Sequence, residues 1–142
     1  IWLDPDLVSS RTLECRRLMR ALPPRPTPDD VSRLAALYSG RFALDFEYEG
    51  WASEYRDSIH AEYLEIVERS LIDDVSTGHH DRAIKIARRA LDIDPRSDRV
   101  EESLLRLYKA TGAHSAAAEQ YSHYSGVLRD ELGIESPPLE SI

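Results

Sequence analysis

Histidines and acidic pairs are the side chains of this chain that could bind a metal ion or move a proton. His79, His80 and His114 lie in two short segments 34 residues apart, where imidazole nitrogens could meet around a zinc ion. His60 and His123 have no partner at ligand spacing. Because histidines in polar turns are commonly solvated, we interpret all five as non-ligands and predict no metal site.

Two acidic pairs are candidates for proton transfer. Asp29-Asp30 and Asp73-Asp74 fall near expected helix ends, where carboxylates commonly cap the helix or face solvent. The chain contains no glycine-rich phosphate loop and no nucleophile elbow, and its single cysteine, Cys15, has no histidine at catalytic spacing. We therefore expect a protein without enzymatic activity and without a cofactor.

Charged residues at helical spacing offer a different kind of site, a binding surface. Arg99, Glu102, Arg106 and Lys109 are three, four and three residues apart, which puts them on one stripe of a helix. Three cations on one stripe could clamp an acidic partner or a peptide carboxylate. A solvated face with Glu102 paired to Arg99 or Arg106 is the simpler interpretation, and we prefer it.

A second candidate surface is a cluster of arginines near the N-terminus. Between residues 7 and 25 there are five arginines and one glutamate, a local balance of +4. Its members Arg11, Arg16, Arg17 and Arg20 could contact DNA phosphates, or they could pair with the acidic surface of the same protein. The sequence supports the two interpretations equally.

The chain as a whole is acidic. Its 142 residues carry a formal net charge of -8, with 26 acidic and 18 basic side chains, so phosphate backbones should repel it. With 42% hydrophobic residues it can build a sizeable core, and no apolar run is long enough to cross a bilayer. We expect one soluble cytoplasmic domain with no membrane partner.

The pattern of apolar residues and helix breakers predicts an all-α fold of about six helices. Thr27-Pro28 is a typical helix start, and Gly133 followed by Pro137-Pro138 is a typical stop. A short edge strand is predicted at residues 1–4, and residues 39–49 should connect two helices through Phe42, Leu44 and Phe46. The helices are expected at residues 10–22, 27–38, 50–76, 80–91, 97–110 and 114–132.

The later helices contain an internal repeat. An offset of 34 residues places Gly112 on Gly78 and Ala117 on Ala83. This period is that of a tetratricopeptide-like helical hairpin, in which glycine permits the turn and alanine lets the helices approach. We therefore predict two such repeats over residues 64–132.

Three features together resemble a known family. The stretch YSGRFALDFEYEGWASEYRDSIHAEY, the two 34-residue hairpins and the ending LRDELGIESPP are similar to the bacterial transcriptional activation domain of SARP-type regulators. The resemblance covers nearly all 142 residues. In that family the domain follows a winged-helix DNA-binding domain, so residues 1–5 would be the seam to such a domain, absent here, and residues 1–142 one regulatory domain.

The resemblance also implies the function and the partners. The domain would support DNA binding, dimerisation or contact with the transcription machinery. It would touch RNA polymerase, a second protomer or a signalling protein, and it would reach promoter DNA through the absent domain. Two alternatives stay open: a stand-alone tetratricopeptide adaptor that binds peptides, and the helical sensor of a larger nucleotide-hydrolysing regulator.

Overall fold

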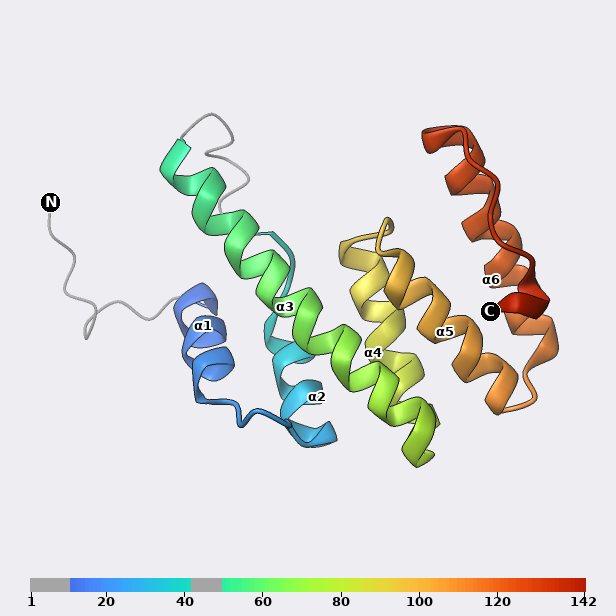
Figure 1. Cartoon of the computed structure of the whole chain (residues 1–142). Helices are drawn as coiled ribbons and strands as arrows, with labels where there is room; N and C mark the ends of the chain where they lie inside the picture. The colour runs from blue at the N-terminus through green and yellow to red at the C-terminus, as the bar shows by residue number, and fades with distance from the viewer. Residues whose placement is uncertain (1–10, 42–49) are drawn as a thin grey trace, which may run out of the picture. The chain divides into compact units, whose positions relative to one another are not determined.

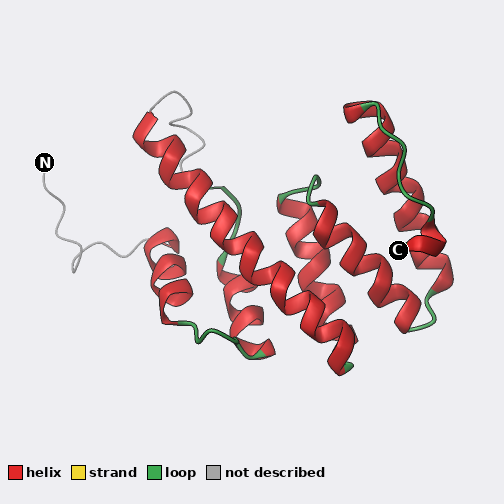
Figure 2. Ribbon diagram, viewed as in Figure 1, coloured by secondary structure: helices red, strands yellow, loops and turns green. Residues whose placement is uncertain are grey.

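The computed structural model describes residues 11–41 and 50–142, apart from the side chains of Trp51 and Ala52. Every regular element in these ranges is helical (Figure 2), which confirms the predicted all-α fold. The predicted edge strand and the anchoring residues Phe42, Leu44 and Phe46 lie outside the described residues. The α-helices are α1 (Arg11–Ala21), α2 (Pro28–Leu37), α3 (Gly50–Thr77), α4 (His80–Ile93), α5 (Asp98–Ala110) and α6 (His114–Val127) (Figure 1).

The chain divides into two compact units, Ile1–Ser70 and Leu71–Ile142. Helix α3 begins in the first unit and ends in the second. The expected single domain over residues 1–142 and the expected repeat bounds at residues 64–132 remain predictions.

In the first unit, local chemistry sets where α2 begins. The Thr27 hydroxyl accepts a hydrogen bond from the Asp30 amide at 3.3 Å, and the Asp30 carboxylate accepts one from the Thr27 amide at 3.0 Å. This reciprocal capping box satisfies two amides at the helix start, and Pro28 follows where no amide donor is needed. The hydrogen bonds from Thr27 lower the pKa of Asp30 below its ordinary value of 3.8.

The core of the first unit is a layer of apolar side chains from three helices. At its centre the rings of Tyr38 and Tyr63 stack with centroids 4.0 Å apart, and the Tyr38 hydroxyl lies 2.9 Å from His60 Nδ1. Tyr63 and Ile59, four residues apart on α3, are both buried in this core. Among the residues described in this unit, the other buried apolar side chains are Cys15, Met19, Val31, Leu34, Ala35 and Val67.

The second unit contains the predicted glycine turns. Gly78 (φ 85°) ends α3 and Gly112 (φ 71°) ends α5, both in the left-handed conformation that glycine adopts without strain. Helix α4 buries Ala83, Ala87 and Ala90, and it packs against α5, which packs in turn against α6. Small side chains on α4 allow this close packing, as expected for a tetratricopeptide-like hairpin.

The last helix differs from the prediction in its final turn. The sequence predicts one helix to residue 132, but α6 ends at Val127 and a π-helical turn, η2 (Leu128–Leu132), follows. The wider turn keeps Leu128 buried beside Tyr124 while Arg129 and Asp130 stay exposed. Gly133 (φ 66°) then closes the helix, as predicted.

Candidate functional site

Helix α5 presents the predicted charged stripe on its exposed side. The opposite side of α5 carries the buried residues Val100, Leu104 and Leu107. Because of the helical period, the charged stripe therefore faces outward. Arg106 Nη2 lies 3.4 Å from Glu102 Oε2, one of the two pairings expected for Glu102.

Two cations of the stripe also contact a distant part of the chain, residues 134–142, here called the C-terminal segment. Arg106 Nε donates a hydrogen bond to the main-chain oxygen of Ile142 at 3.1 Å. Lys109 Nζ donates one to the main-chain oxygen of Leu139 at 3.4 Å. The stripe is therefore engaged within the chain by a peptide main chain, a contact that the sequence did not indicate.

Helix α6 holds the same segment from another side. The Tyr121 hydroxyl donates to the main-chain oxygen of Pro137 at 2.9 Å and accepts from the Ser136 hydroxyl at 3.1 Å. The hydroxyls of Ser125 and Ser136 are 2.7 Å apart. These contacts fix the proline-containing part of the segment alongside α6, where the chain doubles back in Figure 1.

The segment also contributes apolar contacts. Leu139 and Ile142 pack against a cluster formed by Leu105, Tyr124 and Leu128. The short 3-10 helix η3 (Leu139–Ser141) places residues three apart on one side, so both side chains reach the cluster. Two apolar residues after the Pro137-Pro138 pair were the signal in the sequence that could have predicted this return.

Tyr124 anchors the cluster with a polar contact. Its hydroxyl donates to Asp98 Oδ1 at 3.3 Å and so ties α6 to the start of α5. Burial raises the pKa of Tyr124 to about 12, so the hydroxyl keeps its proton near neutral pH.

The arginines of α1 have different surroundings. Arg16 is partly buried, with its guanidinium carbon 4.7 Å from the centroid of the Tyr55 ring, a cation–π contact. Arg11, Arg17 and Arg20 are exposed. Of the four candidates, Arg16 packs against an aromatic ring, Arg17 and Arg20 are exposed, and the exposed Arg11 also lines a small cavity.

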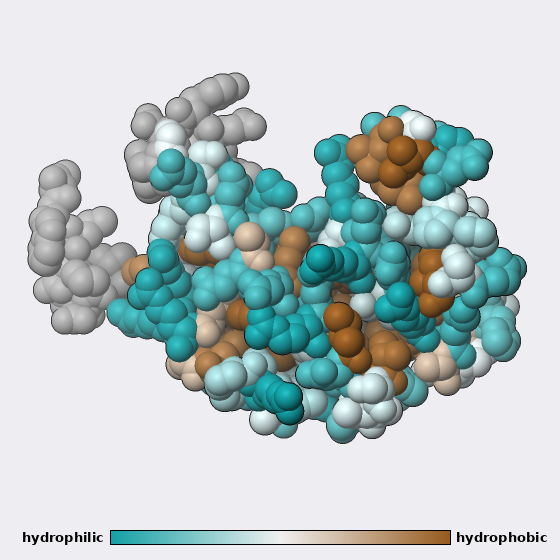
Figure 3. Space-filling model, viewed as in Figure 1, coloured by the Kyte–Doolittle hydropathy of each residue, from teal (hydrophilic) through white to brown (hydrophobic). Residues whose placement is uncertain are grey.

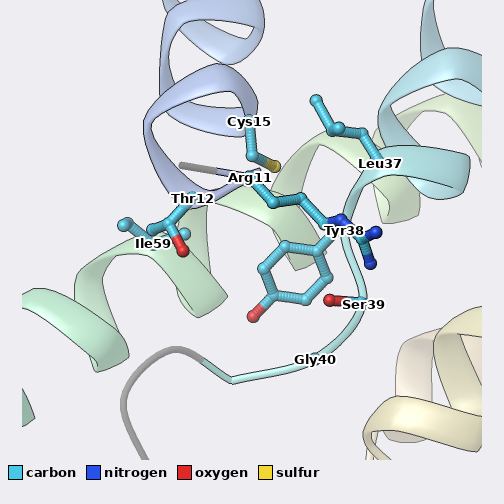
Figure 4. Close-up of a pocket in the computed structure, with 8 residues that line it drawn as sticks. All are labelled: Arg11, Thr12, Cys15, Leu37, Tyr38, Ser39, Gly40 and Ile59. Atoms are coloured by element: carbon cyan, nitrogen blue, oxygen red, sulfur yellow. The ribbon is translucent and has the colours of Figure 1, made fainter. Parts of the chain in front are cut away.

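A small cavity lies beside α1 (Figure 4). It is lined by Arg11, Cys15, Tyr38 and Ile59 among others and has a volume of about 30 Å³. Ligand pockets in proteins measure about 300–1,000 Å³, so this cavity fits water but no ligand. Burial raises the pKa of the Cys15 thiol to about 11, so its unreactive protonated form prevails at neutral pH.

A larger hollow is lined by residues of α4, α5 and α6, and no motif in the sequence indicated it. Glu101 on its wall is only 3% exposed, and both its carboxylate oxygens accept hydrogen bonds from Gln120 Nε2, at 3.1 and 2.9 Å. Burial raises the pKa of Glu101 above its ordinary value of 4.5, and the Gln120 hydrogen bond and His123 partly offset this. Glu101 thus joins α5 to α6 by a buried polar contact.

The turn histidines serve local contacts. His79 Nδ1 lies 3.1 Å from the Thr77 hydroxyl and 3.9 Å from Asp74 Oδ1, and His80 Nε2 lies 3.4 Å from the Val75 main-chain oxygen. Among the described residues no group of three histidine, cysteine, aspartate or glutamate side chains is arranged to hold a metal ion. Likewise, no described helix is long and apolar enough to cross a membrane.

The exposed apolar side chains gather partly at the end of the second unit. Leu132 and Ile134 are 57% and 50% exposed, and Figure 3 shows hydrophobic atoms at the turn that follows α6. Arg96 and Glu131 form an ion pair of 2.8 Å that holds this turn to the loop between α4 and α5.

Stacked helical hairpins, here with an outward-facing charged stripe on α5, are typical of a class of protein, the helical scaffolds. The family comparison agrees with this class. The model of the bacterial transcriptional activator domain matches residues 4–140, and the chain belongs to that family, as the SARP-type resemblance predicted. No curated protein and no solved structure matched the chain. The protein is therefore a regulatory domain of a transcriptional activator, of a family that is not enzymatic.

Proposed function

We propose that this domain strengthens promoter binding by a winged-helix DNA-binding domain joined before residue 5, and that it does so through contacts with other proteins in the cytoplasm. The match of the activator family to residues 4–140 carries this proposal. The net charge of -8 supports it, because an acidic domain needs a neighbouring domain to hold DNA. RNA polymerase, a second protomer and a signalling protein are the partners in question.

Strengthening requires a free-energy coupling between the domains. Couplings of about 1–3 kcal/mol are typical and change an affinity about 5–150-fold. The domain would supply this energy by binding a partner or a second copy at the promoter, with no chemical step.

A gel-shift titration tests the proposal. We expect residues 1–142 alone to leave a promoter fragment unshifted, and the protein extended at its N-terminus to shift it. The extended protein should bind at least fivefold more tightly than its DNA-binding domain alone. Binding of DNA by residues 1–142 alone, or no gain from adding them to the DNA-binding domain, would contradict the proposal. A full reading frame with no DNA-binding fold before residue 1 would favour a stand-alone adaptor.

A further inference from the structure

We propose that the C-terminal segment is a terminal cap: it covers the end of the stack of helices that a further hairpin would otherwise cover. The inference goes beyond the proposed function, because it concerns how the second unit is completed and depends on no partner and no DNA. It assigns a structural task to residues 134–142, which follow the π-helical turn η2 and lie outside the predicted repeats.

The stack of helices in the second unit ends at α6. Helix α4 packs against α5 and α5 packs against α6, whereas no α-helix follows α6 in the described part of the chain. In repeat proteins each hairpin buries its apolar side by stacking on its neighbours, so the last hairpin needs a cap with a polar outer face. The side chains that need cover here are Leu105, Tyr124 and Leu128, which come from α5, α6 and η2.

The C-terminal segment returns directly to these three side chains. Gly133 closes the π-helical turn, the Ile134 amide donates to the Leu128 main-chain oxygen at 3.3 Å, and the chain then runs back along α6 (Figure 1). The helix end itself makes this reversal, so no long loop has to be ordered to bring the segment into contact.

The segment has the two sides that a cap requires. Leu139 and Ile142 are partly buried and pack against the cluster of three side chains, none of which is more than 5% exposed. The two residues between them, Glu140 and Ser141, are polar and exposed. An apolar inner side and a polar outer side thus alternate within the single 3-10 turn η3.

Both helices of the last hairpin hold the segment. Arg106 and Lys109 donate to its main chain from α5, and Tyr121 and Ser125 contact it from α6. The segment therefore ties the two helices together while it covers their apolar side chains. A further hairpin, of this chain or of a second copy, can pack against these side chains only by displacing it.

The test removes the inner side of the cap and leaves the helices unchanged. In the full chain, Leu139→Ser combined with Ile142→Ser should lower the equilibrium constant for folding at least tenfold, because two side chains lose their apolar contacts. Urea unfolding followed by circular dichroism measures this change. Binding of Nile red, an uncharged dye that fluoresces on apolar surfaces, should rise at least threefold in the folded variant, because the cluster opens to water.

A matched variant changes the outer side of the same segment. Glu135→Gln combined with Glu140→Gln substitutes two exposed residues and should leave both the folding equilibrium and dye binding unchanged. A folded Leu139→Ser, Ile142→Ser variant that equals this control in stability and in dye binding overturns the proposal. An equal loss of stability in the two variants also overturns it, since the inner side of the segment would then have no special role.

A second measurement needs no substitution and applies if the Leu139→Ser, Ile142→Ser variant loses its helices. In η3 the Ser141 amide donates to the Pro138 main-chain oxygen at 2.8 Å, and the Ile142 amide donates to that of Leu139 at 3.3 Å. In the unsubstituted protein, both amides should exchange hydrogen at least tenfold more slowly than in the free peptide ESPPLESI, as followed by NMR. Exchange at the rate of the free peptide overturns the cap.

Discussion

Polar contacts between α5 and α6, one of them from the buried Glu101, support the specific pairing of these helices in the second unit. Glu101 reaches Gln120 across the α5–α6 contact, and Asp98 receives the Tyr124 hydroxyl from the same helix. A buried polar group without its partner costs about 1–3 kcal/mol, so the contacts of buried Glu101 and Tyr124 favour one register of α5 against α6. Glu101 is the more informative residue because burial raises its pKa.

The raised pKa of Glu101 predicts a pH dependence of stability. Between 4.5 and its raised value the folded state binds more protons than the unfolded state, so the free energy of unfolding falls as pH rises through that window. Glu101→Gln keeps an acceptor for the Gln120 amide and has no proton to lose. We expect urea titrations from pH 4.5 to 7 to show this fall in the parent protein and its absence in Glu101→Gln.

Gln120→Ala provides the matched variant. It removes the hydrogen bond that lowers the pKa of Glu101, so the fall should become larger. If the free energy of unfolding changes with pH in the same way in the parent and both variants, the pKa of Glu101 is the same in the folded and unfolded states, which would contradict the prediction.

At the scale of elements, helix ends are set by a few residues with particular backbone chemistry. The capping box of Thr27 and Asp30 starts α2, and left-handed glycines end α3, α5 and the π-helical turn. These ends were predictable because the responsible interactions span three or four residues. The π-helical turn was not, because it depends on the burial of Leu128 against α5.

The two kinds of glycine in the second unit should respond oppositely to alanine. A Cβ added at Gly112 or Gly126 meets no atom within 4 Å, so only the backbone decides. Gly112→Ala should destabilise by about 1–2 kcal/mol, since its φ of 71° strains any other residue. Gly126→Ala, within α6, should stabilise by about 0.5–1 kcal/mol, since alanine favours a helix.

Thermal and urea unfolding of both variants measure these effects. If both substitutions destabilise the protein, Gly126 is needed for the change of backbone conformation from α6 to the π-helical turn. Unchanged stability in Gly112→Ala would mean that this turn tolerates a right-handed backbone.

At the scale of the whole molecule, the charges are unevenly distributed over an acidic chain. Exposed arginines on α1 belong to the first unit, whereas the cations on α5 that hold the C-terminal segment belong to the second. The α1 arginines remain candidates for the DNA-proximal role, whereas Arg106 and Lys109 of α5 contact the chain's own C-terminal segment. Arg16 on α1 also packs against the Tyr55 ring.

Salt dependence of promoter binding separates the two interpretations of α1. In the N-terminally extended protein, Arg17→Ala with Arg20→Ala should reduce the slope of log affinity against log salt by nearly one unit for each phosphate that these arginines neutralise. Arg16→Ala should instead mainly lower stability, by about 0.5–1 kcal/mol for a cation–π contact. An unchanged slope for the double variant would mean that these arginines do not approach DNA.

The helices, the glycine turns and the family could all be derived from the amino-acid sequence, because each depends on residues close together in the chain or on their fixed 34-residue period. The contacts that the charged stripe of α5 makes with the C-terminal segment could not be derived in this way. Arg106 meets Ile142 across 36 positions and Lys109 meets Leu139 across 30. Only the packing of the C-terminal segment against Leu105, Tyr124 and Leu128 brings these groups together, because a contact between distant segments depends on how the intervening helices fold.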